Sequence, residues 1–318
     1  QGLSVMVFDV EGEYIEMDKP TDRLMDRLAK FNLEPAGVKD LEVYVPYPSF
    51  CHRLGAVKFG INFWDVEKGV FAEVAGLNRM EQLYFQDLIE KVTAVTPDSR
   101  MVTLEAVIDR LETRLKGQTD RPTLPPFIAE AHTTLYSKLC LIADQNMIDV
   151  EAPNIKMEEV FRAGRVSVID FSDASDYVRN IVIADLLDKA FKHKIMNPKT
   201  PQLLIVIEEA HAFISREKRD RMLATLMLVI ETARRGRKRG LSLGIVTQQP
   251  AHLPSELLEL CNTRIIHRIS STANIDVLRE STGNVPEGMW STVPSLGRGE
   301  SLFASHKYSR ALSVLMRP

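Results

Sequence analysis

The chain has 318 residues, of which 45% are hydrophobic and 26% charged, and its formal net charge is −3. This length allows one large core or two modest ones, and the slight negative charge argues against a protein that coats nucleic acid with its whole surface. No apolar run approaches the roughly 20 residues that a bilayer helix needs, so we expect a cytoplasmic protein without a membrane contact. The three cysteines, Cys51, Cys140 and Cys261, are far apart and predict neither a disulfide framework nor a zinc site.

The first predicted strand is short and is followed by an acidic turn. Residues 4–8 form an apolar run that ends in Asp9, and the sequence DVEGEY then turns the chain at its glycine. Acids around a glycine are also typical of an ordinary surface turn. We expect a helix over residues 21–33, capped by Thr21, and a second strand over residues 41–45.

The middle of the chain has a different character. Between residues 61 and 157 the strand-like runs disappear and about four amphipathic segments follow, with apolar residues at helical spacing, for example Leu104, Ile108, Leu111 and Leu115. We therefore predict a helical insertion over residues 61–157. It would divide an α/β core into a first part, residues 1–60, and a second part, residues 158–318.

Strands and helices alternate again after residue 165. Residues 166–171 are expected to form a strand, residues 177–192 a helix, and further strands are expected over residues 203–207, 243–247, 264–269 and 301–305. This alternation predicts a mainly parallel sheet with helices on both faces. The functional edge of such a sheet is formed by the carboxyl ends of its strands.

The most informative stretch is QLLIVIEEAH, residues 202–211. Its five consecutive large apolar residues suit a central parallel strand, and Glu208 and Glu209 follow where that strand would end. This pattern is typical of a Walker B element, in which one carboxylate, here Glu208, holds Mg²⁺ through water and the next, here Glu209, orients or deprotonates the attacking water. The alternative is that both acids only cap the following helix, whose first turn favours negative charge.

A second stretch, ETARRGRKRGLSLGIVTQQP, covers residues 231–250. A basic, glycine-punctuated turn leads into an apolar strand that ends in Gln248. A glutamine at the tip of the strand beside Walker B can report on the γ-phosphate, and an arginine before that strand can reach the nucleotide of a neighbouring subunit. The two stretches together are more specific than either alone.

Together these segments resemble the HerA family of hexameric DNA translocases, within a larger group that includes FtsK and the conjugation ATPases. The matching segments follow the family's order and are VFDVEGEY, LLIVIEEAHAFI, ETARRGRKRGLSLGIVTQQP and CNTRIIHRI. The resemblance implies a RecA-like P-loop ATPase core that uses ATP and Mg²⁺, with Asp9 near the magnesium or the phosphate-binding lysine. It also implies that Arg234 or Arg237 acts across a subunit interface.

The resemblance further implies a biological setting. It predicts a homo-hexamer that pulls double-stranded DNA through a central pore and feeds a nuclease partner. That partner would be NurA-like, in DNA end resection, or an effector in phage defence.

One expected motif does not occur. The 318 residues contain no GxxxxGK[ST] loop, which grips the nucleotide phosphates in such ATPases. In the family this loop lies directly before the strand that matches residues 4–9. We therefore expect the chain to be the carboxy-terminal part of a longer protein, to lack the family's amino-terminal β-barrel, and to hydrolyse ATP negligibly by itself.

Positive charge is concentrated after the Walker B stretch. Residues 216–239 contain nine Lys or Arg residues and three acids, so the rest of the chain is acidic. This segregation suits a ring whose lumen contacts DNA phosphates, and the candidate DNA-binding residues are Arg216, Lys218, Arg219 and Arg221. The alternative is a basic helix face that is only solvated.

Two other functions are consistent with the same residues. A conjugation-type or secretion ATPase would move protein or single-stranded DNA at a membrane, and it would carry an amino-terminal membrane segment. A non-catalytic scaffold would use the same ring to hold a nuclease or a defence effector. A phosphate loop encoded upstream would count against the scaffold.

Overall fold

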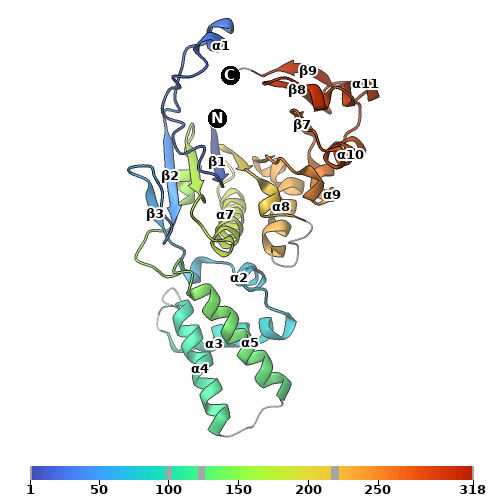
Figure 1. The fold of residues 1–318 in the computed structure, drawn as a ribbon. Helices are drawn as coiled ribbons and strands as arrows, with labels where there is room; N and C mark the ends of the chain where they lie inside the picture. Colours follow the sequence, from blue (N-terminus) through green and yellow to red (C-terminus); the bar gives the residue numbers. More distant parts are fainter. Residues whose placement is uncertain (1, 97, 99–101, 121–125, 216–221, 317–318) are drawn as a thin grey trace.

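The centre of the protein is a six-stranded sheet in the order β3-β2-β4-β1-β5-β6 (Figure 1). The computed structural model describes residues 2–96, 98, 102–120, 126–215 and 222–316. The strands are β1 (Leu3–Asp9), β2 (Leu41–Pro46), β3 (Val57–Phe59), β4 (Val166–Asp170), β5 (Gln202–Ile207) and β6 (Leu241–Ile245). All neighbouring strands run parallel, which confirms the predicted α/β fold with a mainly parallel sheet.

The central strands are apolar on both faces because both faces are covered. In β1, Phe8 belongs to the main core, whereas its neighbour Val7 faces a smaller core that also contains Val43 and Val168. Phe8 is paired in register with Ile169 of β4 and Ile207 of β5. Burial on two sides explains why these strands are nearly continuous apolar runs.

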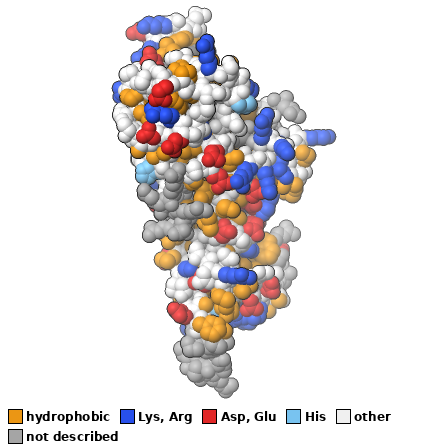
Figure 2. Space-filling model, turned by 90° about the vertical axis from the view of Figure 1, so that its right-hand side faces the viewer, with side chains coloured by type: hydrophobic (Ala, Val, Ile, Leu, Met, Phe, Trp, Pro, Cys, Tyr) orange, Lys and Arg blue, Asp and Glu red, His pale blue; other side chains and the backbone are white. Residues whose placement is uncertain are grey.

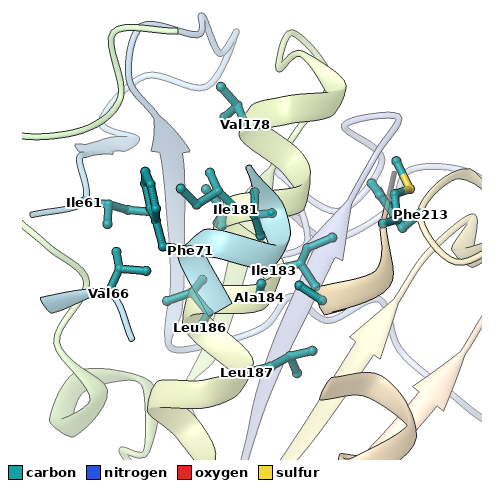
Figure 3. Close-up of a cluster of buried hydrophobic side chains, with 14 of the residues drawn as sticks. Ile61, Val66, Phe71, Val178, Ile181, Ile183, Ala184, Leu186, Leu187 and Phe213 are labelled. Carbon is teal, nitrogen blue, oxygen red and sulfur yellow. The ribbon is translucent and has the colours of Figure 1, made fainter. Parts of the chain in front are cut away.

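One long helix, α7 (Asp176–Met196), covers the main-core side of the sheet, and Ser175 caps it by accepting a hydrogen bond from Val178 N. Figure 3 shows Ile181, Leu186 and other side chains of α7 gathered with Phe71 of α2 (Lys68–Val74). The sheet and the helices that follow β3 are therefore joined by one hydrophobic core.

Most of the helices between β3 and β4 lie beyond one end of the sheet (Figure 1). They are α2, α3 (Arg79–Val95), α4 (Leu104–Asp120) and α5 (Pro126–Ala143), and the short α6 (Met157–Val160) follows. The rings of Phe63 and Phe71 meet edge to face at 5.1 Å, and Phe71 stacks on Phe85 at 5.4 Å, which anchors α3 to α2. The division of the chain into domains stays a prediction.

The helices that follow β5 are α8 (Leu223–Arg235), α9 (Ser255–Leu260), α10 (Thr272–Ser281) and α11 (Glu287–Trp290). Short 3-10 turns lie in the same part of the chain, namely η3 (Ala210–Ala212), η5 (Gly236–Arg239), η6 (Pro250–His252) and η7 (Val293–Ser295). A further turn, η1 (Phe63–Asp65), lies earlier in the chain, between β3 and α2. In the described ranges, no helix is both long and apolar enough to cross a bilayer.

The last strands do not continue the parallel sheet, and this part of the prediction is wrong. β7 (Thr263–Ile266), β8 (Glu300–Ser305) and β9 (Leu312–Leu315) form a separate antiparallel sheet in the order β7-β8-β9. It has its own small core around Trp290 and Val293. The short connection between β8 and β9 is compatible only with antiparallel pairing.

The helix predicted over residues 21–33 is also shorter than expected. Only α1 (Met25–Lys30) is helical, and its N-cap position is Leu24, which has no side-chain cap. Thr21 instead accepts a local hydrogen bond from Arg23 N at 3.1 Å. Threonine often makes such a turn in place of a helix cap.

Candidate functional site

The carboxyl ends of β1, β5 and β6 meet at one edge of the sheet. Glu208 N donates to Phe8 O at 3.2 Å, and Val246 N donates to Ile207 O at 2.9 Å. These hydrogen bonds extend the pairing of β5 with β1, and of β6 with β5, by one residue beyond the ends of β5 and β6. The structure therefore brings Asp9 and Glu208 side by side at the carboxyl edge of the sheet, with Glu209 next to Glu208 in the chain.

Asp9 is fully buried and organises the acidic turn that follows β1. Its Oδ1 accepts hydrogen bonds from Gly12 N at 2.8 Å and Glu13 N at 3.1 Å, and its Oδ2 accepts one from Tyr14 N at 2.9 Å. Gly12 has a φ of 73°, which glycine adopts without strain. Asp9 thus fixes the shape of the turn from inside.

Glu208 is only 5% exposed and lies beside Asp9. Its Oε2 accepts a hydrogen bond from Val10 N at 3.2 Å. Burial, the hydrogen bond with Asp9 and the charge of Asp9 raise the pKa of Glu208 to about 7. The pKa of Tyr14 is also raised, first by burial and then by the charge of Glu208. This pair of carboxyl groups concentrates negative potential at the edge of the sheet.

The donor set at this edge fits Mg²⁺. Mg²⁺ prefers oxygen ligands and is usually held by one or two carboxylates together with water and substrate phosphates. Glu208 offers one such carboxyl group, and Asp9 lies beside it with both oxygens already accepting main-chain hydrogen bonds. Within the described ranges there is no cluster of three or more His, Cys, Asp or Glu side chains that would form an all-protein cage.

Glu209 turns away from Glu208 because its backbone is left-handed. Its φ of 42° and ψ of 46° are unusual for a residue with a side chain, and such strain costs on the order of 1–3 kcal/mol. Oε2 of Glu209 lies 3.0 Å from Nδ1 of His211. The two adjacent acids thus have different contacts. Glu208 accepts a hydrogen bond from Val10, the residue after β1, whereas Glu209 contacts His211, which in turn contacts Thr247 after β6.

Gln248 is at the predicted edge of the sheet but not in contact with the acids. It is exposed and follows β6, and its main-chain oxygen accepts a hydrogen bond from Asn274 Nδ2 at 3.5 Å. In the described part of the chain its side chain makes no hydrogen bond to Glu208 or Glu209. Its role toward the γ-phosphate stays a prediction.

The candidate arginines lie at the opposite edge of the sheet. Leu203 N donates to Gly240 O at 2.9 Å, so η5 lies beside the amino ends of β5 and β6. A strand of this length separates its two ends by roughly 15–20 Å. Arg234 forms an ion pair with Glu256 of α9, whereas Arg237 is exposed.

The four candidate DNA-binding residues, Arg216, Lys218, Arg219 and Arg221, lie outside the described residues. Figure 2 shows basic side chains close to acidic ones on the face of the molecule that it presents. Exposed residues of α8 and η5 include Arg235, which pairs with Glu231 at 2.9 Å, and Lys238. Positive charge in this part of the chain is thus partly neutralised locally.

Sequence reasoning missed four residues of this edge, Tyr14, Asp170, His211 and Thr247. Asp170 ends β4 opposite Asp9, is 1% exposed, and accepts a hydrogen bond from Ser172 N at 2.9 Å. Its position at the end of an apolar run was a usable signal. His211 and Thr247 are 3.1 Å apart between Nδ1 and Oγ1, although they are 36 residues apart in the chain, and no local pattern connects them.

The chain matches known proteins over most of its length. A family model described as "Helicase HerA, central domain" matches residues 1–190. The DNA double-strand break repair helicase HerA of Saccharolobus solfataricus is 27% identical over 310 residues, which cover 95% of this chain and 56% of that protein. The protein of the same name from Pyrococcus furiosus is 26% identical over 173 residues, which cover 44% of this chain and 31% of that protein. The chain thus spans little more than half of one relative and less of the other.

Solved structures share the fold. VirB4 of Thermoanaerobacter pseudethanolicus superimposes with a TM-score of 0.65 at 15% identity, covering 100% of this chain and 82% of that one. The bacterial conjugative coupling protein TrwBdeltaN70 superimposes with a TM-score of 0.59 at 12% identity, covering 98% of this chain and 78% of that one. At these identities the likeness shows a RecA-like α/β fold alone.

Proposed function

The chain belongs to the HerA helicase family, and from this premise we propose that it forms the catalytic part of an ATP-driven motor for double-stranded DNA. One observation carries the proposal. Glu208 and Glu209 follow the buried strand β5, with Asp9 beside Glu208, and with His211, which contacts Thr247 at the tip of β6, beside Glu209. A nucleotide-hydrolysing site needs two neighbouring acids with separate tasks, and the left-handed backbone of Glu209 gives them separate directions.

In this proposal each acid has one role. Glu208, beside Asp9, holds the Mg²⁺ shell through water, and Mg²⁺ when bound supplies charge neutralisation for the phosphates of ATP. Glu209 accepts a proton from the attacking water. Gln248, exposed after β6, reports on the γ-phosphate. Arg237 or Arg234 completes the site of a neighbouring subunit, because both lie at the far edge of their own sheet.

We also propose a ring and a DNA substrate. The relatives are named as DNA double-strand break repair helicases, which supports double-stranded DNA as the substrate. An arginine too far from its own site to act there supports heterologous contacts between subunits, as in a ring, and we propose a homo-hexamer. A nuclease partner, NurA-like or a defence effector, would receive the DNA.

The experiment uses the full-length gene product. Phosphate release from ATP is measured with linear duplex DNA, with single-stranded DNA and without DNA, and the subunit number is measured by native mass spectrometry. We expect six subunits and a rate that duplex DNA raises several-fold. Stimulation by single-stranded DNA alone would favour a conjugation-type motor. A hexamer that binds DNA but releases no phosphate would favour a non-catalytic scaffold. Each of these two results would overturn the proposal.

A further inference from the structure

His211 lies between the acid assigned to proton transfer and the tip of β6. Its Nδ1 is 3.0 Å from Oε2 of Glu209 and 3.1 Å from Oγ1 of Thr247. Glu209 follows β5, and Thr247 follows the neighbouring strand β6. One ring nitrogen therefore contacts the polar side chains of two strand tips, and the imidazole ring is itself largely buried at 22% exposure.

The contact with the carboxylate determines where the proton is. A lone pair on an unprotonated Nδ1 would lie close to an ionised carboxylate oxygen 3.0 Å away and would be repelled by its charge, whereas an N–H at the same place is attracted. This favours the tautomer with the proton on Nδ1 while Glu209 is ionised. The geometry of a hydrogen bond is met toward Thr247, and Oε2 of Glu209 is buried without a hydrogen-bond partner among the described residues. The N–H is thus directed to Thr247, and the nearby Oε2 of Glu209 accepts no hydrogen bond from His211.

Thr247 is itself fixed to the turn that carries Gln248. Its Oγ1 accepts a hydrogen bond from Gln249 N at 3.0 Å. On the other side, Ala210 N donates to Val246 O at 3.0 Å, which connects the backbone after Glu209 to the same strand tip. A displacement of residues 247–249 would therefore move the oxygen that His211 now contacts.

We propose that His211 is a positioning residue that couples the tip of β6 to Glu209. While Thr247 accepts the Nδ1–H, the carboxylate of Glu209 is free of this hydrogen bond and keeps its full basicity toward the proton of water. When the turn after β6 moves away, the imidazole ring turns about its Cβ–Cγ bond and the same N–H donates to Oε2, which lowers the basicity of the carboxylate. Hydrolysis is thereby favoured in one position of the turn. The inference rests on the proposed role of Glu209.

Matched substitutions test the coupling in the full-length gene product. His211→Asn keeps an N–H near the position of Nδ1, whereas His211→Gln places it near Nε2. Thr247→Ser keeps the hydroxyl, and Thr247→Val removes it at equal shape. We expect Asn and Ser to keep kcat within about three-fold, and Gln and Val to lower kcat roughly 10- to 100-fold while KM for ATP changes little, as for other residues that orient a reacting group.

A double variant separates coupling from simple loss of structure. If His211 acts through Thr247, the kcat of His211→Gln with Thr247→Val should match that of the slower single variant, because contacting residues are not additive. Multiplied losses would contradict the inference. So would equal kcat for the Asn and Gln variants.

A spectroscopic measurement does not depend on turnover. Side-chain ¹⁵N shifts of histidine-labelled protein report which ring nitrogen of His211 is protonated, and His211→Asn identifies its signals by their loss. We expect a protonated Nδ1 whose shift changes in Thr247→Val and not in Thr247→Ser. An unprotonated Nδ1, or a shift that ignores Thr247, would overturn the inference even if ATP turnover is confirmed. Absent turnover with the expected shifts would instead contradict the proposed function.

Discussion

The main-chain N–H of Val10 donates a 3.2 Å hydrogen bond to Oε2 of Glu208, so the residue after β1 holds the acid that follows β5. This bond keeps the carboxyl group of Glu208 in a buried position beside Asp9. Burial and the neighbouring acid raise its pKa to about 7. The folded protein therefore prefers the protonated form of Glu208 over part of the range below neutral pH, and stability should depend on pH in a defined direction.

The first prediction follows from that pKa. The pKa of Glu208 rises from its ordinary value of 4.5 to about 7 on folding, so its protonated form adds stability below pH 4.5 that is lost as the pH rises through about 7. Glu208→Gln imitates the protonated form at every pH. The unfolding free energy of the variant relative to the wild type should increase by on the order of 2 kcal/mol between about pH 5 and pH 8.

Urea unfolding of both proteins at several pH values measures this difference. Asp185 also has a raised pKa, about 6, because it is buried. It is present in both proteins, and its contribution therefore cancels in the difference. A difference that stays constant across the pH range would contradict the proposed surroundings of Glu208.

The position of Glu208 and Glu209 could be read from the sequence because strand burial and strand ends leave a local signal. The run before Glu208 is apolar since β5 lies between β1 and β6 and is covered on both faces. The contact between His211 and Thr247 could not be read in this way. It depends on the register of β5 with β6 and on the left-handed backbone of Glu209, and neither follows from local propensity.

The same limit applies to the last third of the chain. Short apolar runs such as residues 263–266 indicate a strand but not its partner. Here the partner is the antiparallel strand β8, and Ile266 and Leu302 of this pair share a small core with Trp290 and Val293. Pairing is a tertiary property, so the sequence predicted the strands but put them in the wrong sheet.

The second prediction concerns the arginines of the basic turn. Arg234 already pairs with Glu256 in the same subunit, so Arg237 is the stronger candidate for action across an interface. Arg237→Ala should lower ATP turnover by roughly 10³-fold or more, as loss of an arginine finger does. Arg237→Lys should not restore it, because an ammonium group lacks the planar fork of guanidinium. Steady-state phosphate release by the full-length protein measures both variants.

Mixed rings test whether the arginine acts in trans. Subunits with Arg237→Ala, or with Arg234→Ala, are combined with subunits with Glu209→Gln, and ATP turnover is measured. Some interfaces then join an intact Glu209 to an intact arginine, so activity should reappear. Lys238→Ala, an exposed neighbour in η5, serves as the control and should change little. No recovery at any ratio, with mixed rings verified by mass, would count against trans action.

The third prediction concerns DNA binding by Arg216, Lys218, Arg219 and Arg221. The logarithm of the DNA-binding constant falls linearly with the logarithm of the salt concentration. Each phosphate contact that is lost should make this slope less steep by roughly 0.9. Alanine substitution of these residues should therefore weaken the binding of duplex DNA most at low salt. It should also reduce the stimulation of ATP turnover by duplex DNA. Arg27→Ala, which removes an exposed charge from α1, is the matched control. An unchanged slope would mean that the four residues form only a solvated face.

The central claim is that Glu209 takes the proton of the attacking water while Glu208 serves the metal. The most direct test is single-turnover ATP hydrolysis by the full-length protein and its Glu209→Gln variant, with ATP affinity measured in parallel. The amide still accepts a hydrogen bond from water but cannot take its proton, so affinity should stay within about three-fold while hydrolysis falls roughly 10²- to 10⁴-fold. Weakened ATP binding with a preserved rate of hydrolysis would contradict the assignment of the two acids.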